Sequence, residues 1–204
     1  MENYNNLNEF QLSALSEIGN IGAGCAATAL SDFMADKVMM SVPELKIIDV
    51  NSMTTILGGP ENEMVGILVT MTDDVQGMLL FLLEKDFVCL LINVLMDKNI
   101  NDFADISEMD MSAIMEIGNI LAGSYVSAIA MMTDLNIRLS TPQVAVDMVG
   151  AILSYPAAYF GFMGDKLLFI EGNFLNEENI IRSHLLIMPE PKSLNLIFES
   201  LGMS

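Results

Sequence analysis

The chain contains little positive charge. Its 204 residues include 8 Lys and Arg against 27 Asp and Glu, so the formal net charge is −19. Nucleic-acid phosphates and anionic lipid surfaces both recruit Lys and Arg, so this balance argues against binding to either one. It favours solubility instead, and it suits a partner with a basic surface.

Histidine, tryptophan and cysteine are also scarce. His184 is the only histidine, tryptophan is absent, and the two cysteines are Cys25 and Cys89. A single histidine provides neither a histidine-rich metal centre nor a Ser-His-Asp triad with a choice of base. Two thiols form no disulfide framework. We expect His184 to be a strand residue, Cys25 to be buried rather than reactive, and the chain to bind no metal.

A secretory leader and a long uninterrupted apolar run are missing too. Residues 1–11 are polar and lack a basic segment followed by an apolar one. The two most apolar stretches are 75–96, which three consecutive charged residues interrupt, and 144–163, which contains Asp147 and Pro156. Charge and proline are costly inside a bilayer. We therefore expect both stretches to be core elements of a cytoplasmic protein.

The chain repeats itself once. Residues 13–30 (SALSEIGNIGAGCAATAL) and 112–129 (SAIMEIGNILAGSYVSAI) are identical at ten of eighteen positions, at an offset of 99. In both copies, 22 residues separate the Asn of EIGN from a later Pro. Internal repeats of this length indicate two copies of one structural unit. We predict a single domain over 1–204, with repeat one at about 8–97 and repeat two at about 108–204.

Hydrophobic periodicity predicts the same order of elements in each copy. In the first copy these are a helix over 8–34, a strand over 38–48, a short helix over 50–57, strands over 64–72 and 76–83, and a helix over 87–96. In the second they are a helix over 108–134, a strand over 137–146, a short helix over 147–155, strands over 166–174 and 181–188, and a helix over 191–202. The expected fold class is α+β: two pseudo-symmetric αβαββα repeats that share one sheet, with the two long helices packed on it.

One face of each long helix carries the same polar residues, within about 60° of one another. They are Ser13, Glu17, Asn20 and Gly24 in the first helix, and Ser112, Glu116, Asn119 and Gly123 in the second. An amide can donate and accept at once, as orienting a water requires, and a carboxylate can pair with a partner's Lys. No nucleophile, metal cluster or phosphate loop accompanies them. The pair could therefore complete a site supplied by another protein, and the alternative is a merely solvated helix face.

Small residues occur elsewhere on the same helices. The face of the first helix opposite the polar residues contains Gly22 and Ala26, which predicts a close approach by another element. Each motif also contains a glycine inside the helix, Gly19 or Gly118. A helix-interior glycine costs about 1 kcal/mol relative to alanine. Both helices therefore keep an unfavourable residue at the same position.

The pattern S-x3-E-I-G-N-x22-P, present at 13–43 and again at 112–142, resembles the signature of the CheC/CheX/FliY phosphatases of bacterial and archaeal chemotaxis. The resemblance covers nearly the whole chain, and two intact motifs favour the CheC branch. It implies hydrolysis of the aspartyl phosphate of the response regulator CheY. It also implies that the regulator's own site holds Mg²⁺ and that this chain needs no cofactor of its own.

The resemblance also implies roles for individual residues. The motif asparagines, Asn20 and Asn119, would position the attacking water. The motif glutamates, Glu17 and Glu116, would pair with the active-site Lys of the regulator. The remaining motif residues would be supporting; they are Ser13, Pro43, Ser112 and Pro142.

A second partner implied by the resemblance is the deamidase CheD. Its expected docking element is the short helix of the second copy, where Asp147 would cap the N-terminus. The apolar contacts would come from Met148, Val149, Ile152 and Leu153. The alternative is that this stretch is ordinary core.

Two other classes of function stay open. A non-catalytic binding or regulatory module for CheD or CheY would need neither asparagine. A metal-dependent hydrolase would need a tight cluster of histidine or carboxylate ligands, and none is evident in the sequence.

Overall fold

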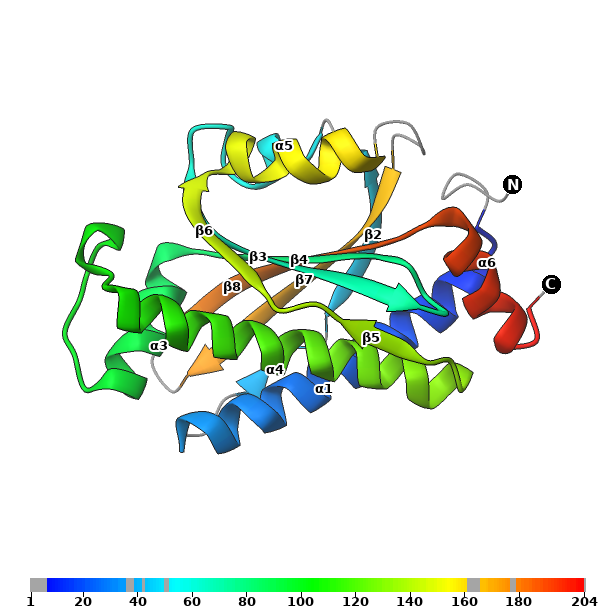
Figure 1. Ribbon diagram of the computed structural model, residues 1–204, viewed down its shortest axis with the longest axis horizontal. Coiled ribbons are helices and arrows are strands. Elements are labelled where there is room, and N and C mark those ends of the chain that lie inside the picture. The colour runs from blue at the N-terminus through cyan, green and yellow to red at the C-terminus, as the bar shows by residue number, and fades with distance from the viewer. Residues whose placement is uncertain are drawn as a thin grey trace.

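A computed structural model describes residues 7–35, 39–41, 43–49, 52–160, 166–176 and 179–203. Both copies follow one order of elements (Figure 1). The first comprises α1 (Glu9–Met34), β1 (Met39–Met40), β2 (Glu44–Asp49), α2 (Met53–Ile56), β3 (Glu63–Asp73), β4 (Gly77–Leu83) and α3 (Lys85–Met96). After the 3-10 helix η3 (Phe103–Asp105), the second comprises α4 (Glu108–Thr133), β5 (Ile137–Leu139), β6 (Gln143–Met148), α5 (Val149–Phe160), β7 (Lys166–Asn176), β8 (Asn179–Pro189) and α6 (Pro191–Ser200).

The two long helices begin at equivalent capping boxes. At the start of α1, Gln11 N donates to Asn8 Oδ1 and Asn8 N donates to Gln11 Oε1, both at 2.9 Å. The start of α4 has the same arrangement between Ser107 and Asp110. A capping box satisfies backbone N–H groups that a helix leaves unpaired in its first turn. Each box therefore sets the first residue of a 26-residue helix that carries a motif.

Each predicted edge strand is divided in two at its proline. Pro43 lies between β1 and β2, and Pro142 lies between β5 and β6. Proline has no N–H to donate to a strand ladder, so it interrupts the pairing there. The predicted strand start at Val38 and the predicted helix start at Val50 lie outside the described residues.

All strands belong to one antiparallel sheet in the order β1-β7-β8-β4-β3-β5, with β2 beside β7 and β6 beside β3. The edge strands are exchanged between the copies: β2 pairs with β7 of the second copy, and β6 pairs with β3 of the first. The register is equivalent on both sides, since Leu45 pairs with Ile170 and Val144 pairs with Ile67. Each half therefore supplies an edge strand to the other half's hairpin.

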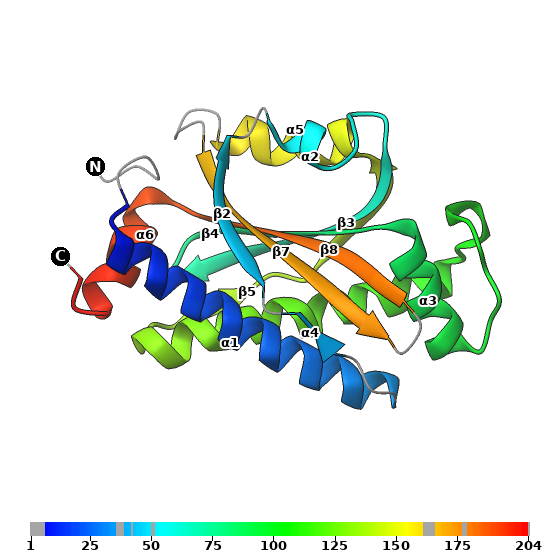
Figure 2. The same cartoon turned by 180° about the vertical axis from the view of Figure 1, so that it is seen from behind.

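Helices cover both faces of the sheet. Figures 1 and 2 show α1 and α4 side by side on one face, and α2 and α5 on the other. Alternate β4 side chains enter two cores: Leu79 and Phe81 face α1 and α4, whereas Leu80 and Leu82 face α2 and α5. A strand that is covered on both faces is apolar throughout. The predicted α+β class, with both long helices on a shared sheet, is confirmed.

Helix α4 is the one described helix that is long and apolar enough to cross a membrane. Of its most apolar window, 56% is buried inside the protein. A core helix of a soluble protein passes the same test of length and composition, so this feature is weak evidence for a span. The contact between α1 and α4 supplies part of that burial, because a Cβ added at Gly22 would lie 2.5 Å from the ring of Tyr125. The predicted close approach at Gly22 is confirmed.

Candidate functional site

The two motifs occupy the outer surface of the helix pair. The side chains of Glu17, Asn20, Glu116 and Asn119 are all exposed, and each pair projects from α1 or α4 on the side away from the sheet. Residues three apart on a helix are neighbours on its surface. The structure thus presents two Glu/Asn pairs on adjacent rigid helices (Figure 1).

In the second motif the Glu and Asn side chains are hydrogen-bonded to each other. Asn119 Nδ2 donates to Glu116 Oε2 at 3.3 Å. This bond restrains the plane of the amide and directs its Oδ1 away from the carboxylate. An amide held in this way has an acceptor that can receive a hydrogen bond from a water or a partner.

Among the described residues, neither motif carboxylate is paired with a cation. Within the described ranges, the ion pairs of Lys and Arg join other carboxylates, and Glu17 and Glu116 take part in none. Two exposed, unneutralised glutamates on a protein of charge −19 favour a cationic group from outside. The arrangement therefore suits pairing with a Lys or Arg of another protein.

The motif glycines let the helices pack closely on the sheet. A Cβ on Gly118 would lie 2.5 Å from Ile67 Cγ2 on β3 and 3.4 Å from Pro142 Cβ. A Cβ on Gly19 would lie 3.2 Å from Ile170 Cδ1 on β7. Because Ile67 and Ile170 occupy equivalent sheet positions, one packing arrangement is built twice. It explains the mid-helix glycine beside each motif asparagine.

The supporting motif residues lie near these contacts. Pro142 is buried and packs beneath the helix at Gly118, next to Asn119, whereas Pro43 is half-buried. Ser13 and Ser112 are exposed, and Ser112 Oγ donates to Glu108 O at 3.1 Å. The proline of the second motif thus supports the helix from below.

An ion pair between buried Asp110 and partly exposed Lys98 holds the start of α4. Asp110 is completely buried, and Lys98 Nζ donates to its two carboxylate oxygens at 2.7 and 2.8 Å. Ser107 N and Ser107 Oγ also donate to it, at 2.8 and 2.7 Å. Burial alone would raise the pKa of Asp110, but the hydrogen bonds from Lys98 and Ser107 outweigh it and lower that pKa. These bonds connect the loop before α4 to the helix that carries the second motif.

The structure corrects the placement of Asp147. This residue lies in β6, paired with Met64 of β3, and Asp147 Oδ1 accepts a hydrogen bond from Met148 N at 2.8 Å. Helix α5 begins at Val149, so Asp147 does not cap it. Pairing with β3 extends the strand through Met148 and delays the helix.

The apolar contacts expected on this helix are also corrected in part. Val149 is completely buried and Leu153 nearly so, and both belong to the core between α5 and the sheet. Ile152 packs over Gly66 of β3. Met148 is 46% exposed and is still accessible to a partner.

Of the histidine and the two cysteines, Cys25 lies on motif helix α1, five residues after Asn20, whereas Cys89 lies on α3 and His184 on β8. His184 is a buried residue of β8, as predicted, with its ring stacked on Phe169 at 5.5 Å and Nε2 3.7 Å from Glu84 Oε1. Cys25 is half-buried rather than fully buried as expected. Cys89 is buried, and that burial raises the pKa of its thiol. His184 and Cys89 therefore add neither a nucleophile nor a general base to the Glu/Asn pairs.

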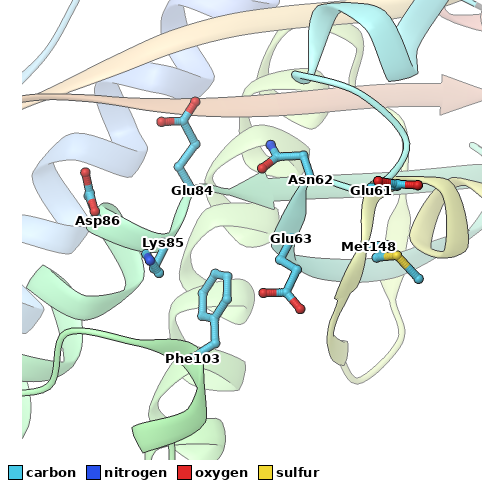
Figure 3. Close-up of a pocket in the computed structure, with 8 residues that line it drawn as sticks. All are labelled: Glu61, Asn62, Glu63, Glu84, Lys85, Asp86, Phe103 and Met148. Atoms are coloured by element: carbon cyan, nitrogen blue, oxygen red, sulfur yellow. The ribbon is translucent and has the colours of Figure 1, made fainter.

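A hollow of about 540 Å³ lies near the junction of β4 and α3 (Figure 3). It is lined by Glu61, Asn62, Glu63, Glu84, Lys85, Asp86, Phe103 and Met148. Lys85 lies 3.4 Å from Asp102, so part of the acidic charge nearby is neutralised. None of the motif residues lines this hollow. Among the described residues, no group of three or more His, Cys, Asp or Glu side chains could hold a metal ion.

Both motif helices lie in segments that match a known protein family. The model of the CheC-like family matches the chain twice, at residues 10–47 and 109–146. A relative from Bacillus subtilis, "CheY-P phosphatase CheC", is 30% identical over 208 aligned residues, covering 100% of both chains. The chain belongs to the CheC-like family. Both family matches contain a complete Glu/Asn pair and its downstream proline.

Other CheC-like relatives differ in how much of the chain they share. The B. subtilis flagellar motor switch phosphatase FliY is 28% identical over 140 residues, which are 68% of this chain and 36% of FliY. The crystal structure of Thermotoga maritima FliY has a TM-score of 0.76 at 20% identity and covers 96% of this chain and 98% of that one. At that identity the structural likeness shows the common fold alone. Membership of the CheC/CheX/FliY family, expected from the motif, is confirmed.

Proposed function

We propose that this protein hydrolyses the aspartyl phosphate of the chemotaxis response regulator CheY. The observation that carries the proposal is the exposed Glu/Asn pair, present on two adjacent helices, with neither Glu in an ion pair with any described Lys or Arg. The name of the full-length B. subtilis relative, a CheY-P phosphatase, supports the same activity. In the reaction a bond forms between water oxygen and phosphorus, and the bond from phosphorus to the aspartyl oxygen breaks.

In this proposal the chain supplies positioning and the regulator supplies the rest of the site. Asn20 or Asn119 enters the regulator's site and holds the attacking water through its amide. Glu17 or Glu116 pairs with the regulator's Lys and fixes the orientation of the two proteins. Phosphoryl transfer depends mainly on positioning and electrostatics, so a single well-placed amide can accelerate it. Mg²⁺ would belong to the regulator's site, and this chain would need no cofactor.

The direct test is phosphate release from phosphorylated B. subtilis CheY with Mg²⁺, with and without this protein. A catalyst accelerates release at amounts far below those of the regulator. A non-catalytic module for CheY or CheD, the second candidate function, binds without changing the rate of release at those amounts. The proposal also requires that the chain share the cytoplasm with its regulator, and it involves neither nucleic acid nor membrane.

The motif glutamates provide a prediction about affinity. Glu17→Gln together with Glu116→Gln should raise the KM for phosphorylated CheY about tenfold, which corresponds to the loss of about 1.4 kcal/mol of binding free energy. The encounter should also lose most of its dependence on ionic strength, because salt screens interactions between exposed charges. Initial rates measured across regulator concentrations at low and high salt check both effects.

A matched control for this experiment is Glu199→Gln, which removes an exposed carboxylate from α6. It should leave the KM unchanged. If the double Glu variant keeps the wild-type KM and salt dependence, the glutamates do not pair with the regulator.

CheD is proposed as a second partner, docked at the end of β6. Asp147 and Met148 are both exposed there, whereas Val149 and Leu153 belong to the core. Asp147→Lys should weaken CheD binding about tenfold through charge reversal and leave phosphate release from CheY unchanged, since the motif helices lie on the other face of the sheet. Titration calorimetry with CheD, with Glu199→Lys as the matched charge reversal, decides whether this surface is used.

A further inference from the structure

Two glycines on the motif helices have no packing role among the described residues. Gly24 and Gly123 lie four residues after Asn20 and Asn119, and a Cβ added at either one would meet nothing within 4 Å. Gly19, Gly22 and Gly118 differ from these two glycines. A Cβ added at Gly19 or Gly118 would meet a residue of the sheet, and one added at Gly22 would meet Tyr125. Glycine is the poorest helix former after proline. Its presence at two open, equivalent positions therefore needs a cause outside this chain.

Helix geometry relates these positions to the motif amides. Each Cα–Cβ bond of a helix tilts toward the N-terminus, so a side chain at i+4 leans back over the residue at i. A side chain at Gly24 would extend over Asn20, and one at Gly123 would extend over Asn119. The asparagine side chain is short. Any partner that must receive this amide has to approach the helix backbone closely at that turn.

We propose that Gly24 and Gly123 are specificity-determining positions that leave the motif amide uncovered, so that the phosphorylated face of the regulator can approach the helix. This inference rests on the proposed function. It identifies the regulator as the occupant of a strip that runs along each helix from the motif amide to the bare glycine. The partner recognised is a folded domain that presents a phosphorylated Asp beside a Lys.

Exposed apolar side chains on the N-terminal side of this strip support coverage of the helix by a partner. Phe10 is 78% exposed and Met109 is 67% exposed, at equivalent positions in the two copies. Each lies ten residues before its motif asparagine, about 15 Å along the helix axis. Glu17 lies within about 20° of Phe10 around the helix. A standard interface of about 800 Å² per partner extends that far, so a regulator docked on the amide would cover these side chains.

The experiment compares two double variants in otherwise wild-type protein. Gly24→Ala with Gly123→Ala should raise the melting temperature by about 4 to 8 °C, because each alanine is the better helix former by about 1 kcal/mol and meets no neighbour. The same variant should lower kcat/KM for phosphorylated CheY about tenfold. Gly24→Leu with Gly123→Leu should lower it about 100-fold, since holding the amide back by about 1 Å costs that much. Substituting both copies makes the result independent of which motif is more active.

The matched control is Ala158→Leu, which adds bulk to an exposed position of α5 on the opposite face of the sheet and should leave kcat/KM unchanged. Higher stability with lower kcat/KM supports the inference, because a merely structural role would move both quantities in the same direction. Wild-type kcat/KM in the Leu variant, or lower stability in the Ala variant, overturns it. Failure of the proposed function is distinguishable: the wild-type protein would then release no phosphate, or would release it without any need for Asn20 and Asn119.

Discussion

Asn20→Ala combined with Asn119→Ala should lower the accelerated rate of phosphate release from CheY by at least about 100-fold, toward the regulator's own rate. The effect is large because, in the proposed mechanism, positioning the water is the only contribution that this chain makes directly to the reacting atoms. Each single variant should keep part of the activity, since each helix presents a complete Glu/Asn pair. Single-turnover phosphate release from phosphorylated CheY measures all three variants.

Loss of folding should not explain this result. Both asparagines are exposed, and alanine is the better helix former, so the free energy of unfolding should not decrease. Thermal unfolding checks this point, and Asn99→Ala serves as the matched substitution at an exposed asparagine between α3 and α4. A double variant that folds and dephosphorylates at the wild-type rate would exclude water positioning by these residues.

Lys98→Met should produce the largest loss of stability among the substitutions considered. It leaves the carboxylate of Asp110 completely buried with only the bonds from Ser107. Removing one partner of a fully buried ion pair costs about 3 to 5 kcal/mol. Because Lys98 is itself 34% exposed, we expect a smaller loss of about 2 kcal/mol in the free energy of unfolding. Chemical unfolding at pH 7 measures this difference.

The pH dependence of the same variant provides a second readout. The pKa of Asp110 is lowered in the folded protein, so the pair stabilises the fold fully at pH values above the unfolded pKa of about 4. That stabilisation disappears as the pH falls through the folded pKa. The difference between Lys98→Met and wild type should therefore be constant from about pH 5 to 7 and should shrink in more acidic solution. Lys85→Met is the control, since its pair with Asp102 is exposed on both sides and should contribute less than about 1 kcal/mol at any pH.

The sequence contains a signal for the start of each motif helix. Ser107-x-x-Asp110 before an apolar helix is a capping-box pattern, and Asn8-x-x-Gln11 is its counterpart in the first copy. The pattern predicts where each motif helix begins. It could not reveal Lys98, because that contact depends on how the loop before α4 folds back on the helix.

Local periodicity and the internal repeat determined the elements and the candidate site. The exposed stripe with Glu17 and Asn20, and its copy with Glu116 and Asn119, follow from helical spacing alone, because 3.6 residues per turn place them on one face wherever the helix packs. The α+β class follows from the order of the periodic segments. The repeat also predicted that the chain consists of two copies of one structural unit.

Tertiary structure alone decided how the two halves combine. The exchange of β2 and β6 between the copies depends on pairing between residues 75 or more positions apart, which no local pattern encodes. The same pairing draws Asp147 into β6 and moves the start of α5 to Val149, which is buried. It also places Ile67 and Ile170 beneath the motif helices, where a Cβ on Gly118 would clash with Ile67 and a Cβ on Gly19 would be in tight contact with Ile170. Side-chain spacing along one segment shows which residues share a face, but long-range strand pairing decides what lies opposite that face.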